Sequence, residues 1–343
     1  MKIGLSYWGF CEDFRNSTVA NTPDGHRYGR PVLVNALNAR GHSVVALQQR
    51  REAEPYPGLT YTDGFPDLDV VFFEWRWPTY KNSGLERFEP DLERQTALLD
   101  YYHEAGVPII AWDTDLKMTP EDERRWPNMI IADPTFEPYE FTLTRYRLPF
   151  WSDFVPIKDA VKDPVEFGYI GNNYERDDMF MKYYSLPSLE LRSAGVQTKV
   201  HGNWLQRSPE RASPESLIQQ HSSIAFGPRV GFKESMDLLS TFVCTVHITK
   251  PRYAKQGFAS PRYLENIITN TPALVPCEFL IPDLLGAYWT VDSPTDVVKK
   301  TLELKAFSPL EREAIVLEQR DALLKHHDFS VNAVCEFIED KVR

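Results

Sequence analysis

The segment GFASPRYLENIITNTPALVP, residues 257–276, decides the fold of the C-terminal half of the chain. It predicts a glycine turn, a Ser-Pro helix start, an amphipathic helix with Arg262 and Glu265 one turn apart, and a buried strand. Such a helix start points free backbone N–H groups and its positive dipole end at whatever precedes it, which suits a pyrophosphate. The carboxylate of Glu265 can accept hydrogen bonds from a ribose diol. The alternative is an ordinary αβ unit, in which Glu265 is only a solvated side chain.

The whole chain predicts a two-domain α/β architecture. Its 343 residues exceed what one core usually organises. Short apolar strands alternate with helices, which indicates parallel sheets covered on both faces. We therefore expect two Rossmann-like doubly wound domains (1–155 and 165–325) facing each other across a cleft. We also expect a C-terminal helix over 326–343 that returns to the N-terminal domain. The proline- and aromatic-rich stretch 148–164 is the predicted linker.

Apolar runs and helical spacing locate the individual elements. A helix before Gly41 is expected, with this glycine just beyond its C-terminus. The other predicted helices are 92–105, 309–325 and 331–342. The predicted strands are 2–8, 43–47, 69–74, 108–113, 129–132, 166–171, 198–203, 223–227, 242–248 and a last one from residue 272.

Composition excludes several classes of protein. No apolar run approaches the roughly 20 residues of a membrane span, and Met1-Lys2 leads straight into a strand rather than a signal peptide, so we expect a cytoplasmic protein, or host-cytoplasmic if phage-encoded. The four cysteines have no paired spacing, which argues against a zinc site or disulfide framework. A net charge of −11 argues against a polyanionic partner, yet the stretch from Phe14 to Arg51 is locally basic. Its arginines are Arg15, Arg27, Arg30, Arg40, Arg50 and Arg51.

Polar residues and glycines follow the predicted strands of the C-terminal half, where ligands of doubly wound sheets bind. Glycine lets backbone N–H groups approach a phosphate, and Arg or Lys neutralises its charge. This set could bind a UDP-sugar without a metal, whereas the absence of GxGxxG and GxxxxGK[ST] disfavours dinucleotide binding and P-loop ATP hydrolysis. The candidate donor-binding residues are Gly171, Asn172, Arg176, Gly202, Asn203, Lys255, Gly257, Ser260, Arg262 and Glu265.

Candidate catalytic groups lie in the N-terminal half. Asp113 and Asp115 follow the strand PIIAW, and continued strand alternation would aim both to the same side. Glycosyl transfer with inversion needs one carboxylate to take the acceptor's proton, a role that suits Asp115, with Asp113 as the fallback and His26 as the runner-up. Otherwise one aspartate caps a helix and the other pairs with Lys117. An Asp-x-Asp pair also resembles the metal-binding motif of single-Rossmann transferases, but it lies in the half opposite the donor signature, so we expect no metal requirement.

Acceptor-binding candidates come from two loops. The long first loop, TPDGHRYGRP, contains Asp24, Arg27 and Arg30. The segment EWRWPTY contains Trp75 and Trp77, which could stack a sugar ring or a flipped base. The alternative is that these tryptophans cap the edge of the sheet.

Taken together, these segments resemble the GT-B glycosyltransferases, in particular the DNA β-glucosyltransferases of T-even phages and more distantly the CgeB-like group. The resemblance implies a UDP-glucose donor and a hydroxymethylated base in duplex DNA as acceptor. It also implies that Thr114-Asp115 supplies the general base, that Arg176 and Gly202-Asn203 match donor loops, and that Arg262 holds phosphate while Glu265 holds ribose. The loop at Arg176 lacks the family's second arginine.

Three functions remain open from the sequence. The first is an inverting, metal-independent transfer of a hexose from a UDP-sugar to a 5-hydroxymethylpyrimidine in phage DNA, with the arginines at 27, 30, 40, 50 and 51 lining one rim of the cleft. The second is a transferase acting on a small molecule, a glycan or a protein. The third is a non-catalytic nucleotide-sugar binder.

Overall fold

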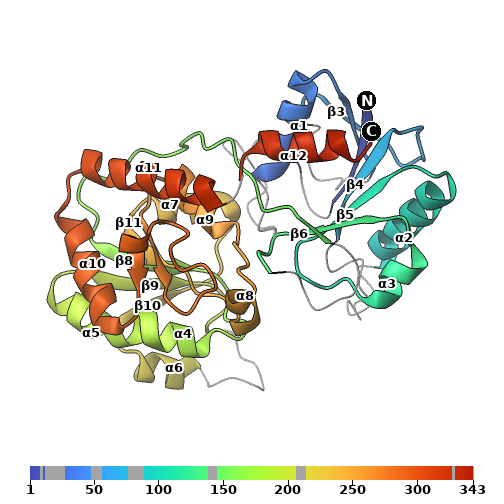
Figure 1. The fold of residues 1–343 in the computed structure, drawn as a ribbon. Coiled ribbons are helices and arrows are strands. Elements are labelled where there is room, and N and C mark those ends of the chain that lie inside the picture. The colour runs from blue at the N-terminus through green and yellow to red at the C-terminus, as the bar shows by residue number, and fades with distance from the viewer. Residues whose placement is uncertain are drawn as a thin grey trace. The chain divides into compact units, whose positions relative to one another are not determined.

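The computed structural model describes residues 1–7, 11, 28–47, 56–75, 89–137, 145–205, 214–326 and 329–342. The chain divides into two compact units (Figure 1). Unit 1 consists of Met1–Asp153 with Phe329–Arg343, and unit 2 is Phe154–Asp328. Both are α/β units with a parallel sheet, as the alternation of apolar strands and helices predicts.

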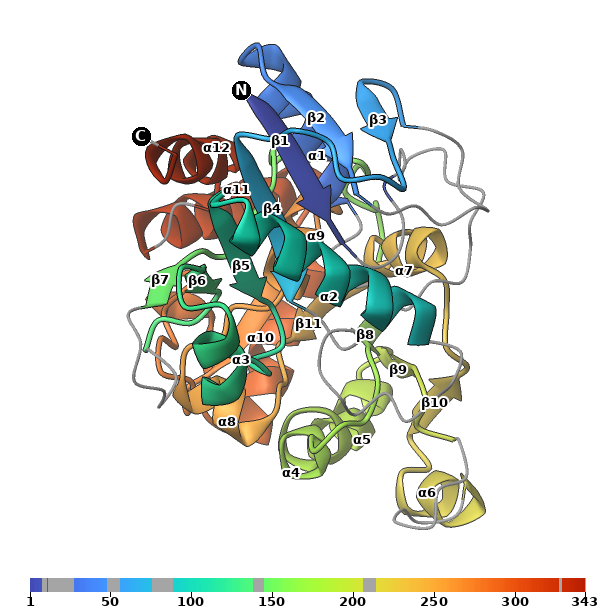
Figure 2. The same ribbon diagram turned by 90° about the vertical axis from the view of Figure 1, so that its right-hand side faces the viewer.

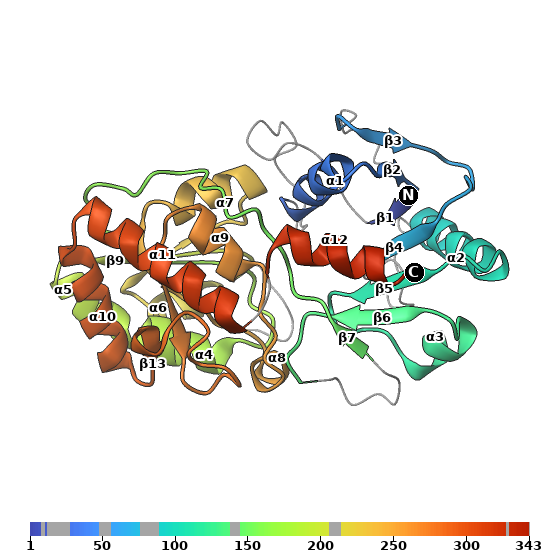
Figure 3. The ribbon, with the colours of Figure 1, turned by 45° about the horizontal axis from the view of Figure 1, so that its top comes forward.

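The described part of unit 1 contains a parallel sheet of seven strands in the order β3-β2-β1-β4-β5-β6-β7. Helices α1 and α12 lie side by side on one face (Figure 3), and α2 crosses the other face (Figure 2). The strands are β1 (Lys2–Ser6), β2 (Ser43–Ala46), β3 (Leu59–Tyr61), β4 (Val70–Trp75), β5 (Ile109–Asp113), β6 (Ile130–Asp133) and β7 (Arg145–Arg147). The helices are α1 (Gly29–Ala39), α2 (Glu89–Glu104), α3 (Pro120–Arg125) and α12 (Val331–Asp340).

The described part of unit 2 contains six parallel strands in the order β10-β9-β8-β11-β12-β13. Helices α4, α5 and α6 lie on one face, and α7, α9 and α11 on the other (Figure 1). The strands are β8 (Glu166–Ile170), β9 (Gln197–His201), β10 (Ile224–Gly227), β11 (Phe242–Val246), β12 (Ala273–Pro276) and β13 (Thr290–Val291). The helical segments are α4 (Asp177–Phe180), the π-helical turn η2 (Met181–Ser185), α5 (Leu186–Ser193), α6 (Pro214–Gln220), α7 (Phe232–Leu239), α8 (Pro251–Lys255), α9 (Arg262–Ile268), the 3₁₀ turn η3 (Ala287–Trp289), α10 (Pro294–Ala306) and α11 (Pro309–His326).

The central strands are buried on both faces, which is why they read as unbroken apolar runs. Every residue of β4, β5, β11 and β12 is buried. The short strands β3, β7 and β13 were not predicted, because two or three residues carry too little periodicity to stand out. Gly41 follows Arg40, the C-cap of α1, and has φ +81°, as a glycine beyond a helix C-terminus should.

The predicted linker, residues 148–164, is not a linker in its first part. Residues 148–153 belong to unit 1, and Trp151 lies in its core. Trp151 is fully buried and its Nε1 donates to the Gly29 carbonyl at 2.7 Å. Trp112 packs 4.5 Å from it, centroid to centroid, and donates its own Nε1 to the Leu148 carbonyl. Proline and aromatic content resembled a linker, but the tryptophan is a core anchor.

The α12 helix belongs to unit 1 although it follows unit 2 in the chain. Its N-terminus is capped by Ser330, whose hydroxyl accepts from the Ala333 N–H. Its half-buried Glu339 is bonded to both Arg40, at 3.1 Å, and His42, at 2.8 Å. Helix α12 therefore completes a layer that begins with α1.

Candidate functional site

The segment 257–276 folds as predicted, and its two charged residues form an ion pair. Gly257 has φ +64° and makes the turn between α8 and the segment that leads to α9. Arg262 opens α9, and its Nη1 lies 2.5 Å from Glu265 Oε2. The Glu265 side chain is 2% exposed and that of Arg262 is 35% exposed. Burial raises the pKa of Glu265, while the guanidinium of Arg262 opposes that shift.

A histidine that sequence reasoning missed lies next to this pair. His247 follows β11 directly, is 7% exposed, and stacks on Tyr263 of α9 with 3.9 Å between ring centroids. Burial and then the nearby positive charge of Arg262 lower its pKa to about 3, so the ring is neutral at physiological pH. No hydrogen bond from the described residues reaches its Nε2. The signal was a polar residue closing an otherwise apolar strand, FVCTVH.

This histidine predicts an acid-dependent loss of stability in unit 2. The pKa in the folded state is about 3 and the ordinary value is 6.5, so below pH 6.5 the unfolded chain binds a proton that the folded chain does not. The contribution of His247 to the free energy of unfolding is therefore fully present above pH 6.5. Below that pH it falls by about 1.4 kcal/mol per pH unit. Urea unfolding at pH 7.5 and pH 5 should show about 2 kcal/mol lost through His247.

The matched variant is His247→Phe, which keeps an aromatic ring against Tyr263 but cannot titrate. Burial also lowers the pKa of His201 and of His221, so the variant should keep part of the acid sensitivity of unit 2. The unfolding free energy should then change less steeply with pH, by up to the about 1.4 kcal/mol per pH unit that the uptake of one proton contributes. An unchanged slope would show that His247 is not the titrating group.

Two of the predicted donor loops are bonded to each other at the carboxyl ends of β8 and β9. The Asn203 N–H donates to Asn172 Oδ1 at 3.1 Å, and the Asn173 N–H donates to Asn203 Oδ1 at 2.8 Å. Gly202 has φ +152°, and a Cβ there would lie 2.1 Å from the Gly171 carbonyl oxygen. Glycine is thus required for close approach of the loops, and the asparagines brace one loop against the other.

The other predicted donor residues have different surroundings. Arg176 turns back onto its own loop, and its Nη1 donates to the Asn172 carbonyl at 2.8 Å. Lys255 is exposed, and Ser260 is half-buried just before α9.

Several buried polar atoms after the strands of unit 2 have no partner in the described part of the chain. They are Arg176 Nε, His201 Nδ1, His247 Nε2 and Gln256 Oε1. These residues follow or end β8, β9 and β11, and Gln256 ends α8. Buried polar groups are nearly always hydrogen-bonded, so unsatisfied ones at the carboxyl edge of a doubly wound sheet are typical of a ligand site.

In unit 1 the two aspartates at the end of β5 differ in burial, and extended strand geometry does not continue to Asp115. The strand ends at Asp113 because the chain turns there, with the Thr114 N–H donating to the Trp112 carbonyl. Asp113 is fully buried, and its carboxylate accepts from the N–H groups of Lys117, at 2.8 Å, and Met118, at 2.9 Å. Asp115 is half-buried. Asp113 is therefore not an accessible base, and the fallback role predicted for it is wrong.

The surroundings of Asp113 are strongly polar for a buried site. Arg145 on β7 places Nη1 3.3 Å from Asp113 Oδ2 and 3.4 Å from Asp133 Oδ2, and its Nη2 lies 3.3 Å from Glu123 Oε1. Burial raises the pKa of Asp113 to about 6, against the lowering effects of the Lys117 amide and of Arg145. Among the described residues, no group of three or more His, Cys, Asp or Glu side chains has a geometry that could hold a metal ion.

Two predicted acceptor-binding residues are core residues instead. Arg30 is 2% exposed and pairs with Glu74 through two bonds, Nε to Oε1 at 2.8 Å and Nη2 to Oε2 at 2.6 Å. Trp75 is fully buried and packs edge-to-face on Trp126. Arg30 ends in the core because it lies in the first turn of α1, on the face that covers the sheet. The predictions for Asp24, His26, Arg27 and Trp77 lie outside the described residues, as do those for Arg50 and Arg51.

Of the five arginines predicted to form a basic rim, the structure describes Arg30 and Arg40, and neither is available for such a rim. Arg30 is in the core, and Arg40 is paired with Glu336, at 3.3 Å, and Glu339. Their charges are neutralised within unit 1.

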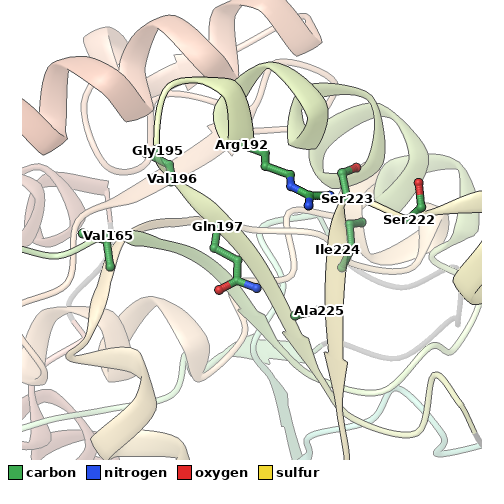
Figure 4. Close-up of a pocket in the computed structure, with 9 residues that line it drawn as sticks. All are labelled: Val165, Arg192, Gly195, Val196, Gln197, Ser222, Ser223, Ile224 and Ala225. Atoms are coloured by element: carbon green, nitrogen blue, oxygen red, sulfur yellow. The ribbon is translucent and has the colours of Figure 1, made fainter.

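The described part of unit 2 also has a hollow of about 390 Å³ at the opposite, amino-terminal edge of the sheet. Figure 4 shows Arg192 reaching from α5 towards Ser223, and Gln197 below it at the start of β9. The hollow lies where β9 and β10 begin, away from the strand ends that carry Arg262 and Glu265. It does not form part of the candidate site.

No helix of the described chain combines the length and apolarity that a membrane span requires. No protein-family model and no curated protein matches the sequence.

Comparison with solved structures gives matches along the whole chain. The β-glucosyltransferase of phage T4 is 14% identical with a TM-score of 0.60, over 100% of this chain and 99% of that one. A second structure of that enzyme, with UDP and Mn²⁺, gives a TM-score of 0.61 at 14% identity, again over 100% and 99%. AviGT4, a glycosyltransferase involved in avilamycin A biosynthesis, is 12% identical with a TM-score of 0.55, over 100% and 97%. The chain therefore has the two-domain GT-B fold that these proteins share.

Proposed function

We propose that the protein is a glycosyltransferase that moves a hexose from a UDP-sugar to a hydroxyl group of an acceptor. The observation that carries the proposal is the pair formed by Arg262 and the buried carboxylate of Glu265 in unit 2 of a GT-B fold. In such a donor site Glu265 accepts hydrogen bonds from the ribose hydroxyls. Arg262, whose guanidinium is partly exposed, binds a phosphate oxygen.

The donor region also has neutral and backbone groups available for a ligand. His247, uncharged beside Arg262, can bond a donor oxygen or hydroxyl without adding charge. The braced loops at Asn172 and Asn203 hold Gly171 and Gly202 in fixed positions, so a ligand that binds there meets a preorganised surface.

We assign the general base to Asp115 in unit 1. In an inverting reaction Asp115 removes the proton of the acceptor hydroxyl, whose oxygen forms a bond to the anomeric carbon. The bond from that carbon to the diphosphate oxygen breaks, and UDP leaves with the electron pair, its charge offset by Arg262. No step of this scheme requires a metal, although UDP and Mn²⁺ were seen together in the T4 phage enzyme.

The acceptor is proposed only as a hydroxyl compound. A 5-hydroxymethylpyrimidine in duplex DNA is the acceptor that the family resemblance implies. Support for it from a basic rim is weakened by Arg30 and Arg40, which are neutralised within unit 1. Small molecules, glycans and proteins are therefore tested beside it.

The test is a two-way panel. UDP-sugars are first screened for binding by calorimetry, with and without Mn²⁺, and then incubated with hydroxymethylated DNA, ordinary DNA and pooled hydroxyl acceptors. A hexose mass increment on an acceptor, with stoichiometric UDP, is the expected result. Binding without turnover on any acceptor would favour a non-catalytic binder, and no binding of any UDP-sugar would overturn the proposal.

Donor binding makes a specific prediction at Glu265. Glu265→Gln keeps the side-chain shape and one acceptor oxygen but removes the charge, which makes a hydrogen bond to ribose about 1–1.5 kcal/mol stronger than a neutral one. The Kd for UDP should rise about 5- to 12-fold by calorimetry. The matched control is Glu318→Gln on the exposed side of α11, which should leave the Kd unchanged. Equal Kd values for wild type and Glu265→Gln would remove Glu265 from the site.

A further inference from the structure

The carboxylate of Asp113 fastens the turn that carries Asp115. Its Oδ1 accepts from the Lys117 N–H at 2.8 Å and its Oδ2 from the Met118 N–H at 2.9 Å. Between these anchors the chain makes two tight bends, one at Thr114 and one at Leu116, which has φ +53°. A leucine in the left-handed region persists only where its surroundings impose it. The two hydrogen bonds from the backbone N–H groups of Lys117 and Met118 to Asp113 supply that constraint.

Arg145 ties this turn to the neighbouring strand and helix. Its side chain is 2% exposed and reaches Asp113 at the end of β5, Asp133 at the end of β6, and Glu123 on α3. Asp133 in turn accepts from the Thr135 N–H at 2.9 Å, which holds the turn after β6. One guanidinium therefore links the carboxyl ends of two adjacent strands to the helix that follows the first of them.

We propose that Asp113 and Arg145 are positioning residues for Asp115: they hold the turn over residues 113–118 in the conformation that presents Asp115 at the carboxyl edge of the unit 1 sheet. This inference rests on the proposed function, in which Asp115 is the base. We place neither residue in contact with the reactants, because both side chains are engaged within the protein: Asp113 by two backbone amides, and Arg145 by three carboxylates. Their contribution is to fix the base, and a misplacement of about 1 Å in a catalytic group costs roughly 100-fold in rate.

Asp113→Asn is the sharpest variant, because it is isosteric and replaces one acceptor oxygen and the negative charge by an NH₂ donor. An amide has one oxygen, so its NH₂ group faces the Lys117 N–H in one orientation, and both the Met118 N–H and Arg145 in the other. At least one of the two anchors of the turn is then lost. Arg145→Lys is the second variant: a single ammonium cannot span three carboxylates as a guanidinium does, and the effect on the turn should be smaller.

The kinetic test is a double-mutant cycle on the transferase reaction. Asp113→Asn should lower kcat about 100-fold with the Kd for UDP unchanged. In an Asp115→Asn background the same substitution should change kcat by less than about threefold, because a base that is absent cannot be misplaced. Equal losses in both backgrounds would show that Asp113 acts on stability alone and would overturn the proposal. Asp100→Asn, which breaks the exposed pair with Arg125, is the control.

A second measurement is independent of turnover. Hydrogen exchange at the Lys117 and Met118 amides should become faster in Asp113→Asn, and less so in Arg145→Lys, while the amides of β4 keep their protection. Unchanged exchange at both amides would overturn the proposal even in an active enzyme. If the wild type transfers no sugar, the proposed function fails, whereas exchange still decides whether Asp113 holds the turn.

Discussion

Asp115→Asn is expected to lower kcat about 10²–10⁴-fold, the range found when a general base is removed from a proton-transfer step. The amide keeps the shape of the carboxylate but cannot take the acceptor's proton. Donor affinity should not change, because the residues proposed to bind UDP are in unit 2. The measurement is steady-state transfer with saturating UDP-sugar, together with calorimetric binding of UDP to the same preparation.

The control for this substitution is Asp67→Asn. Asp67 is exposed in unit 1 and precedes β4, so it lies at the opposite end of the sheet from the turn after β5. It should retain full activity. If Asp115→Asn also retained full activity, Asp115 would not be the base, and His26 would be the next candidate to test.

Glu74→Ala should cost unit 1 about 3–5 kcal/mol of unfolding free energy, the usual effect of leaving one partner of a buried ion pair uncompensated. The two side chains are 2% and 4% exposed, so water cannot replace the lost carboxylate at Arg30. The guanidinium would keep its contact over the ring of Tyr7, at 5.0 Å, but would lose both bonds to the carboxylate. Urea unfolding followed by hydrogen exchange at β1 and β4 would report the loss in unit 1.

The companion variant Arg30→Met/Glu74→Leu separates a missing partner from a missing pair. Replacing a buried pair by apolar residues is often neutral, so the double variant should lose much less than Glu74→Ala alone. The exposed pair of Arg125 and Asp100 sets the scale for a surface bridge, about 0–1 kcal/mol. A loss in Glu74→Ala no greater than that would mean that the pair is hydrated in solution.

Much of the fold could be predicted, because burial on both faces leaves a strong trace in the sequence. The runs VVFFEW and FVCTV became β4 and β11 for that reason. The acceptor-binding roles predicted for Trp75 and Arg30 are wrong, because the sequence does not show which side of a strand or helix a tryptophan or arginine occupies. The core position of Trp151 is not visible in the sequence, because its hydrogen bond to the Gly29 carbonyl joins residues far apart in the chain.

The candidate site was predictable where local spacing decides geometry. Arg262 and Glu265 are three apart on one helix, so their meeting follows from helical pitch. The stacking of His247 on Tyr263 depends on how a strand and a helix pack, which no local pattern reveals. Asp113 was misassigned because strand alternation was extended past the residue where the chain turns.

The membership of α12 in unit 1 sets an order for synthesis of the protein. The ribosome releases residues 1–153 long before the helix that pairs with α1 exists, while 154–328 contains every strand and helix of its own core. Arg40 and His42 meet Glu339 only after residue 339 has been synthesised. A nascent chain that stops short of residue 329 therefore carries a finished second unit and an unfinished first one.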